Sequence, residues 1–400
     1  MKNPMDVHHP VHHGKHRRRR RHQRILVVGL SLLLLAGGIV AALAWNGGPS
    51  SSDGQQGGAA VSSAASDHGG HASTEGTTSS PAPPPESVAT PGAGSVVAVG
   101  TAPHDLVVSP DGSFAYIADP GVGAVIRFDT AGNRQTATIP VPEAPPQMVT
   151  FSPDGSRAYV SAFDEEFTVN FVAILDTGTD TKIAVVPVGR GPYAAATTLD
   201  GRLLFLPFYD EDHLDVLDAN SGARVIRIPL APSPHWVAFS HDRRFAYVTN
   251  HFSDLVTVLD LHTYAVVTTI PVGDGPHSLE FSPDGTRVAV VNYISGDVSI
   301  IDPTSNAVVA TVPAVGAGPQ DVTYAPDGRH FYTANVDDGT MAVVDAGSGV
   351  VTARVPVGSS PTSVGVTPDG GRVFVTNFGD GTVRVLEGAP TRSRAAGRTQ

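Results

Sequence analysis

The 400-residue sequence contains no cysteine and few charged side chains. The absence of cysteine excludes disulfide bridges, thiolate metal and iron–sulfur sites, covalently attached haem and a cysteine nucleophile. Asp, Glu, Lys and Arg together make up only 16% of the residues, which is low for a cytosolic enzyme. Phosphate-binding loops, G-x-S-x-G elbows and H-E-x-x-H zinc motifs are also missing. No common enzyme motif therefore assigns a reaction to this chain.

The charges that are present are divided unevenly along the chain. Eight of the 26 Lys and Arg residues, but only one of the 38 Asp and Glu residues, fall within residues 1–24. The formal net charge of −12 thus combines a basic, histidine-rich head with an acidic body. An acidic body repels nucleic acid, so we expect no nucleic-acid partner.

A long apolar run follows the basic head. Residues 25–44 carry no charge, and 20 residues in a helix span about 30 Å, the thickness of a bilayer core. We expect residues 1–24 to be a cytoplasmic tail and residues 25–45 to be a single transmembrane signal anchor. The alternative is a signal peptide cleaved after Ala44, because Ala42-Leu43-Ala44 forms an A-x-A site. The body is extracytoplasmic in both cases: held at the cell membrane by the anchor, or secreted if the leader is cleaved.

Two further segments lack the pattern of a folded domain. Residues 46–94 are rich in Gly, Ser, Ala, Thr and Pro, and they show no apolar periodicity. This composition predicts a disordered linker. A polar tail at 388–400 is predicted to be disordered as well.

The body between these segments consists of seven repeats. Their turns, mostly of the form Pro-Asp-Gly, have aspartates spaced 43, 46, 42, 42, 43 and 42 residues apart, at Asp111, Asp154, Asp200, Asp242, Asp284, Asp327 and Asp369. Each unit of about 42 residues holds four short β-rich runs that alternate between apolar and polar residues, as in 245–250 and 256–260. Four-stranded units at this period predict an all-β fold, a seven-bladed β-propeller over residues 95–387. The seventh unit lacks its fourth strand, and residues 95–100 match that strand, so we expect the N-terminal strand to close the last blade.

The second strand of several units ends in a shared motif. Tyr-Val-Thr-Asn occurs at 247–250, Val-Thr-Asn at 375–377, Ala-Asn at 334–335 and Val-Asn at 291–292. These motifs resemble the YVTN-type repeats of archaeal surface-layer proteins and bacterial YncE-like periplasmic proteins. The resemblance implies the fold more than the function, because related propellers include lactonases and eight-bladed relatives that bind the haem of cytochrome cd1 nitrite reductases. The sequence departs from the pattern at the insertion 163–170 and at 206–209, where Leu-Pro-Phe-Tyr replaces the motif.

One position in every unit varies in a way that indicates a site. It follows the proline, or its equivalent, that opens the innermost strand, and is occupied by His104, Gln147, Tyr193, His235, His277, Gln320 and Thr362. Blade topology brings this position to one mouth of the central channel, together with the strand-ending Asn250, Asn292, Asn335 and Asn377. We predict that these side chains contact a ligand. His104, His235 and His277 are candidate ligands for a divalent metal ion. The alternatives are hydrogen bonds to an organic ligand, turn capping, or contacts with channel water.

Acidic loops are expected on the same face. The densest patch combines 164–166 with 210–213, and it is a candidate site for a hard cation such as Ca²⁺. The leading functional hypothesis is a membrane-tethered binding module that contacts an unidentified small molecule or envelope protein at the channel mouth. The alternatives are a propeller enzyme, either a lactonase-like hydrolase or a cofactor-binding redox protein, and a structural component of a surface layer.

Overall fold

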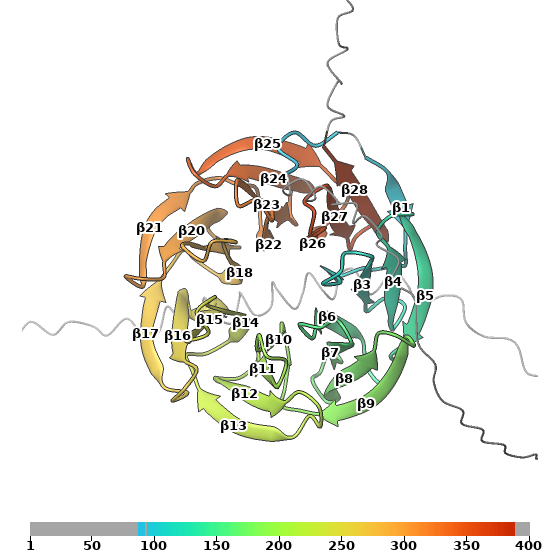
Figure 1. The fold of residues 1–400 in the computed structure, drawn as a ribbon, viewed down its shortest axis with the longest axis vertical. Coiled ribbons are helices and arrows are strands. Elements are labelled where there is room, and N and C mark those ends of the chain that lie inside the picture. The colour runs from blue at the N-terminus through green and yellow to red at the C-terminus, as the bar shows by residue number, and fades with distance from the viewer. Residues whose placement is uncertain (1–86, 93, 389–400) are drawn as a thin grey trace, which may run out of the picture.

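The computed structural model describes residues 87–92 and 94–388, and these form a closed ring of seven four-stranded antiparallel sheets (Figure 1). The predicted seven-bladed propeller is therefore confirmed. Residues 1–86, which include the expected anchor at 25–45 and most of the expected linker, lie outside the described residues, as does the tail from 389. Within the described part, no helix is both long and apolar enough to cross a bilayer.

Each blade runs from an innermost strand at the channel to an outermost strand at the rim (Figure 1). Blades 1 to 3 contain β2 (Asp105–Val108), β3 (Phe114–Asp119), β4 (Ala124–Asp129), β5 (Arg134–Pro140); β6 (Pro146–Phe151), β7 (Arg157–Phe163), β8 (Asn170–Asp176), β9 (Thr181–Pro187); and β10 (Ala196–Thr197), β11 (Leu203–Pro207), β12 (His213–Asp218), β13 (Arg224–Pro229). Blades 4 and 5 contain β14 (Pro234–Phe239), β15 (Phe245–Asn250), β16 (Leu255–Asp260), β17 (Val266–Pro271); and β18 (Pro276–Phe281), β19 (Val288–Asn292), β20 (Asp297–Asp302), β21 (Ala307–Val312). Blades 6 and 7 contain β22 (Pro319–Tyr324), β23 (His330–Asn335), β24 (Thr340–Asp345), β25 (Val350–Pro356); and β26 (Pro361–Val366), β27 (Arg372–Asn377), β28 (Thr382–Glu387), β1 (Val96–Ala98). A three-residue 3₁₀ helix, η1 (His251–Ser253), follows β15.

The repeated Pro-Asp-Gly turns reverse the chain between the innermost and second strands. In blade 1, Asp111 accepts hydrogen bonds from the Ser109 hydroxyl and the Ser113 amide, and Gly112 adopts a φ of 74° that a side chain would disfavour. We call the face of the ring that carries these turns the far face. The opposite face, which carries the loops leading into the innermost strands, is called the mouth face.

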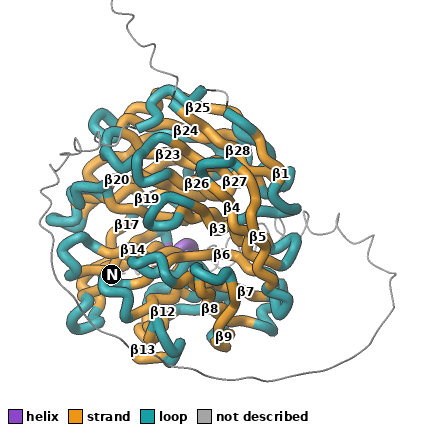
Figure 2. The backbone as a smooth tube through the Cα atoms, turned by 45° about the vertical axis from the view of Figure 1, so that its right-hand side comes forward, coloured by secondary structure: helices purple, strands orange, loops and turns teal. Residues whose placement is uncertain are grey.

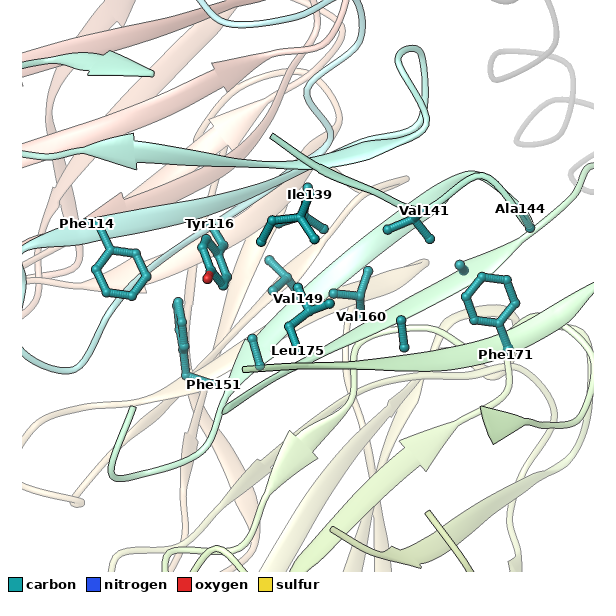
Figure 3. Close-up of a cluster of buried hydrophobic side chains, with 14 residues drawn as sticks. Phe114, Tyr116, Ile139, Val141, Ala144, Val149, Phe151, Val160, Phe171 and Leu175 are labelled. Atoms are coloured by element: carbon teal, nitrogen blue, oxygen red, sulfur yellow. The ribbon is translucent and has the colours of Figure 1, made fainter. Parts of the chain in front are cut away.

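The core consists of apolar layers between adjacent blades. The second strands are almost completely buried, whereas the outermost strands alternate between covered and exposed residues. Figure 3 shows one such layer, where Tyr116 of blade 1 stacks on Phe151 of blade 2 with ring centroids 5.2 Å apart. Because every blade needs two neighbours to cover its apolar faces, the ring has to close. Figure 2, turned by 45° from Figure 1, shows that strands make up most of the blades and that loops and turns join them.

Closure is made by the N-terminal strand, as predicted. β1 pairs antiparallel with β28, and Val96 lies opposite Arg384. The segment before β1 also contacts the propeller, so the expected linker boundary at residue 94 is too late. Val88 is 2% exposed, and its amide donates to the Tyr332 hydroxyl over 2.9 Å. The Tyr332 hydroxyl donates to the Val88 carbonyl over 3.3 Å. The Tyr116 and Tyr247 hydroxyls likewise donate to the turn before the outermost strand of the next blade, so residues 87–92 take the place of that turn for blade 7.

Candidate functional site

Five of the seven mouth residues form one cluster across the channel. Tyr193 stacks on His235 with ring centroids 3.9 Å apart, and the His235 ring meets the edge of His277 at 4.1 Å. His104 of blade 1 lies 6.4 Å from the Tyr193 ring, and its Nε2 is 3.4 Å from the Gln320 amide nitrogen of blade 6. The repeat alignment thus identified side chains that are far apart in sequence and meet in space.

The two other mouth residues are linked to the cluster by hydrogen bonds to backbone carbonyl groups. The carbonyl of Gln147 accepts a hydrogen bond from His104 Nδ1 over 2.9 Å. The Thr362 hydroxyl donates to the His104 carbonyl over 2.6 Å. His235 Nδ1 likewise donates to the carbonyl of His277 over 3.2 Å. In three blades, therefore, the mouth side chain bonds to the backbone of the next blade, which fixes its position.

Blade 3 departs from this regularity, and the departure explains the tight stacking. Its innermost strand β10 is only two residues long, and the preceding Ala194 forms a parallel bridge with Trp236 of blade 4. The Ala194 amide donates to the His235 carbonyl over 3.3 Å. Because the chain leans toward blade 4 at this point, the neighbouring Tyr193 ring is carried onto His235.

A second tier of rings surrounds the cluster, and the sequence reasoning missed it. It is formed by the residue that follows the asparagine, or its equivalent, at the end of the second strand, which is aromatic or histidine in five blades: Phe163, Tyr209, His251, Tyr293 and Phe378. The His251 ring lies 5.3 Å from His235 and 5.7 Å from His277, and Phe378 lies 5.9 Å from His104. The signal was present in the same alignment, one position beyond the motif.

The imidazoles of the cluster are uncharged at neutral pH. Burial lowers the pKa of His104, and burial together with the neighbouring imidazoles lowers the pKa values of His235 and His277 well below the ordinary range. Burial lowers the pKa of His251 to about 4. His251 Nδ1 lies 3.2 Å from the Pro276 carbonyl and must donate to it, so Nε2 carries the lone pair. That Nε2 is buried and has no hydrogen-bond partner among the residues that the structure describes.

The four strand-ending asparagines do not belong to this site, which corrects the prediction. All four are fully buried, and three of them bond to the loop that leads into their own blade. Asn250, Asn335 and Asn377 donate to the carbonyls of Ala231, Val315 and Val357, respectively. Asn292 instead donates to the Asp297 carboxylate and the Ser299 hydroxyl. These asparagines hold the blade together and present no surface to a ligand.

The predicted metal sites are not formed either. Among residues 87–92 and 94–388, no group of three or more histidine or acidic side chains is arranged to hold a metal ion. In the histidine cluster, Nδ1 of His104 and of His235 donates to a backbone carbonyl, which leaves only Nε2 for a metal ion, and the Nε2 of His104 faces the Gln320 amide nitrogen at 3.4 Å. In the acidic patch, Asp164 accepts bonds from the amides at 168 and 169, and Arg190 bonds to Asp210 over 3.2 Å. Carboxylates that fasten the loops in this way do not converge on a cation.

Buried carboxyl groups lie deeper in the channel, one residue beyond the mouth positions. Asp105 Oδ2 accepts the amide of Val149 in blade 2, and Asp321 Oδ2 accepts the amide of Val364 in blade 7. The Ser363 hydroxyl lies 3.1 Å from an oxygen of each aspartate. Because a hydroxyl has one hydrogen to donate, one of the two carboxyl groups must be protonated to complete both contacts.

The protonation of this pair agrees with its burial. Burial raises the pKa of Asp105 to about 7 and that of Asp321 to about 6. Glu280, whose Oε2 accepts the Tyr324 amide over 2.6 Å, has a pKa raised by burial to about 8. The carboxyl groups cap amides at the inner edges of blades 2, 6 and 7, which no further strand covers. They stabilise the channel lining by hydrogen bonds.

The mouth face is strongly acidic outside the cluster. Its loops and loop ends contain a single basic residue, Arg190. They contain fourteen acidic residues: Asp119, Glu143, Asp164, Glu165, Glu166, Asp210, Glu211, Asp212, Asp254, Asp274, Asp297, Asp337, Asp338 and Asp380. Several of these cap backbone amides, as Asp380 caps Ser359, but capping does not remove their charge. Glu143 is paired with Lys182 and Asp210 with Arg190, and the other carboxylates give the surroundings of the neutral rings a net negative charge.

Comparison with known proteins supports the fold and offers one functional lead. A family model described as the cytochrome D1 heme domain matches residues 235–323, which hold His235, His251 and His277. A structure of Kuenenia stuttgartiensis hydrazine synthase is similar, with a TM-score of 0.66 and 21% identity over 72% of this chain and 96% of that chain. No curated protein sequence matches. The chain is thus a seven-bladed β-propeller, similar in part to the cytochrome D1 heme domain; the finer YVTN resemblance stays a prediction.

Proposed function

We propose that this chain is a binding module that takes a small ligand at the ring cluster of its mouth face. The observation that carries the proposal is the buried Nε2 of His251, which lies among the rings without a hydrogen-bond partner in the described part of the chain. An unpartnered buried acceptor costs free energy of about 1–3 kcal/mol, and a ligand that donates to it recovers part of that cost.

The surroundings of this atom favour binding over hydrolysis. Nδ1 of His104, of His235 and of His251 donates to a backbone carbonyl. Each of these imidazoles can therefore act as a base only through Nε2. The Nε2 of His104 faces the Gln320 amide nitrogen, and the Nε2 of His251 has no hydroxyl partner among the described residues that it could activate as a nucleophile. Rings held by blade-to-blade bonds form a rigid recognition surface.

The proposal is tested by thermal unfolding of the full chain with two probes, zinc chloride and butylammonium chloride. We expect at least one probe to raise the melting temperature, and His251→Phe to reduce that shift. The matched control is His262→Phe, because His262 is exposed on the far face. If neither probe shifts the melting temperature, or if both variants respond as the unmodified chain does, the cluster is not a binding site.

The family match favours haem as a second candidate. Imidazole nitrogen suits haem iron, and His251 Nε2 is available. The porphyrin of haem does not fit the cluster. The Tyr193 and His235 ring centroids are 3.9 Å apart and those of His235 and His277 are 4.1 Å apart, which leaves no room for a porphyrin plane between the rings. The propionate groups of haem would also face the fourteen acidic residues and one arginine of the mouth face. We therefore assign no haem chemistry. A haemin titration is expected to leave the Soret band unshifted, and a shift that His251→Phe removes would reverse this assignment.

The proposal includes a location outside the cytoplasm. It rests on the sequence alone: residues 25–45 act as a single-pass anchor, or the module is released if the leader is cleaved after Ala44. Membrane fractionation, together with the mass of the mature chain, tests both forms. A full-length chain in the soluble cytoplasmic fraction would contradict the proposal.

A further inference from the structure

We propose that the ligand taken by this mouth is a small protonated amine, which donates an N–H to His251 Nε2 and rests its charge on the surrounding rings. The inference rests on the proposed function and deepens it by naming the ligand class. Three independent features of the mouth converge on this chemistry: an acceptor atom, the faces of aromatic rings, and a negative surround.

The acceptor atom, His251 Nε2, sets the first requirement for the ligand. His251 Nδ1 is committed as a donor to the Pro276 carbonyl over 3.2 Å, so Nε2 can only accept. The side chain is 2% exposed, and within residues 87–92 and 94–388 Nε2 has no hydrogen-bond partner. A ligand that completes this site must carry a hydrogen-bond donor. This requirement disfavours carboxylates, phosphates and other groups that only accept.

The rings set the second requirement. His251 has Tyr209 at 6.4 Å, Phe252 at 4.9 Å and Tyr293 at 6.5 Å between centroids. The three neighbours are half-buried, so their rings are partly open to the mouth. Aromatic faces attract cations electrostatically, by about 0.5–2 kcal/mol per contact. Phe252 lies on the short helix η1 and is the ring closest to His251, so we expect it to move when the amine reaches Nε2.

The electrostatic surround sets the third requirement. The fourteen acidic residues and one arginine of the mouth face attract cations and oppose anions. Tyr293 is directly joined to this surround, because its hydroxyl lies 3.3 Å from Asp337. A cation seated over Tyr293 therefore lies beside a carboxylate as well. A protonated amine meets all three requirements, whereas a quaternary ammonium lacks the N–H and an alcohol lacks the charge.

The test is isothermal titration of the full chain with three probes of similar size. We expect butylammonium to bind roughly tenfold more tightly than tetramethylammonium, and 1-butanol not to bind measurably. In His251→Phe the ring remains but the acceptor is lost, so the preference for butylammonium over tetramethylammonium should fall to about one. In Tyr293→Leu both cations should weaken. Tyr264→Leu, on the far face, is the matched control and should bind as the unmodified chain does.

Two results would overturn the inference. One is equal binding of 1-butanol and butylammonium, which would mean that burial of the alkyl chain, and not charge, drives association. The other is a preference for butylammonium that survives His251→Phe. If zinc chloride stabilises the chain through His251 while butylammonium fails to bind, the amine inference falls and the proposed function stands. If neither probe binds, both fall.

Discussion

Replacement of Asp105 by asparagine should make the propeller more stable at alkaline pH relative to the unmodified chain. Asp105 is 3% exposed, accepts the Val149 amide, and lies 3.1 Å from the Ser363 hydroxyl. An asparagine side chain can keep both contacts, because its oxygen accepts from Val149 and its amide donates to Ser363. The variant would therefore imitate the protonated carboxyl group at every pH.

The magnitude follows from the raised pKa. The pKa of Asp105 moves from 3.8 to about 7, mainly through burial, and each unit corresponds to about 1.36 kcal/mol. A carboxyl with a raised pKa holds its proton more tightly in the folded state. Its contribution to stability is therefore complete below about pH 4 and is lost as the pH rises through about 7. The unmodified chain should lose up to about 4 kcal/mol through this group, and Asp105→Asn should not.

Denaturant unfolding of both chains between pH 5 and pH 8.5 measures this effect. The difference in unfolding free energy should grow in favour of the variant by about 3 kcal/mol between pH 5 and pH 7 and level off above that pH. Asp111→Asn is the control, since hydrogen bonds from Ser109 and Ser113 lower the pKa of Asp111, and its effect should not vary over this interval. A difference for Asp105→Asn that is equally flat would refute the reasoning that Asp105 shares a proton in the channel.

Three further predictions concern the blades, the closure and the cluster. Asn377→Ala should lower the unfolding free energy by about 1–3 kcal/mol in urea, because it leaves the Val357 carbonyl without its partner, whereas a change within error would show that this bond is dispensable. Tyr332→Phe should cost about 1 kcal/mol and speed hydrogen exchange at the Val88 amide, and unchanged exchange there would contradict the contact. Because burial lowers the pKa of His251 from 6.5 to about 4, its stabilising contribution is present above pH 6.5 and is lost as the pH falls toward 4. The melting temperature of His251→Phe should therefore be less sensitive to acid than that of the unmodified chain, and equal sensitivity would show that His251 is not the group that titrates.

The sequence was sufficient to predict the fold because each repeat is defined by interactions between residues that are close together in the sequence. A Pro-Asp-Gly turn needs only its own residues to reverse the chain, and seven such turns at a constant period leave few alternatives to a ring. Closure by residues 95–100 followed from counting strands. The contribution of Val88 was hidden, because its partner Tyr332 is 244 residues away and the surrounding composition is that of a linker.

The site was only partly predictable, because the sequence does not show in which direction each side chain points. The repeat alignment identified which residues reach the mouth, but it does not say where a side chain points. Asn250 and His251 are neighbours at the end of β15; one bonds inward to its own blade, and the other joins the ring cluster. The stacking of Tyr193 on His235 depends on the short β10 and its lean toward blade 4, which no periodicity in the sequence encodes.

The closing strand has a mechanical consequence. The ring is completed by the pairing of three residues, Val96 to Ala98, with β28, and the chain ahead of them is held by Ser87 to Asp327, a turn residue of the far face. Tension applied to the N-terminus therefore loads the contacts of Ser87 and Val88 with blade 6 first and the pairing of β1 with β28 in blade 7 next, from the side opposite the rings. A force large enough to separate β1 from β28 would open the ring between its first and last blades before it disturbed the ring cluster at the mouth face.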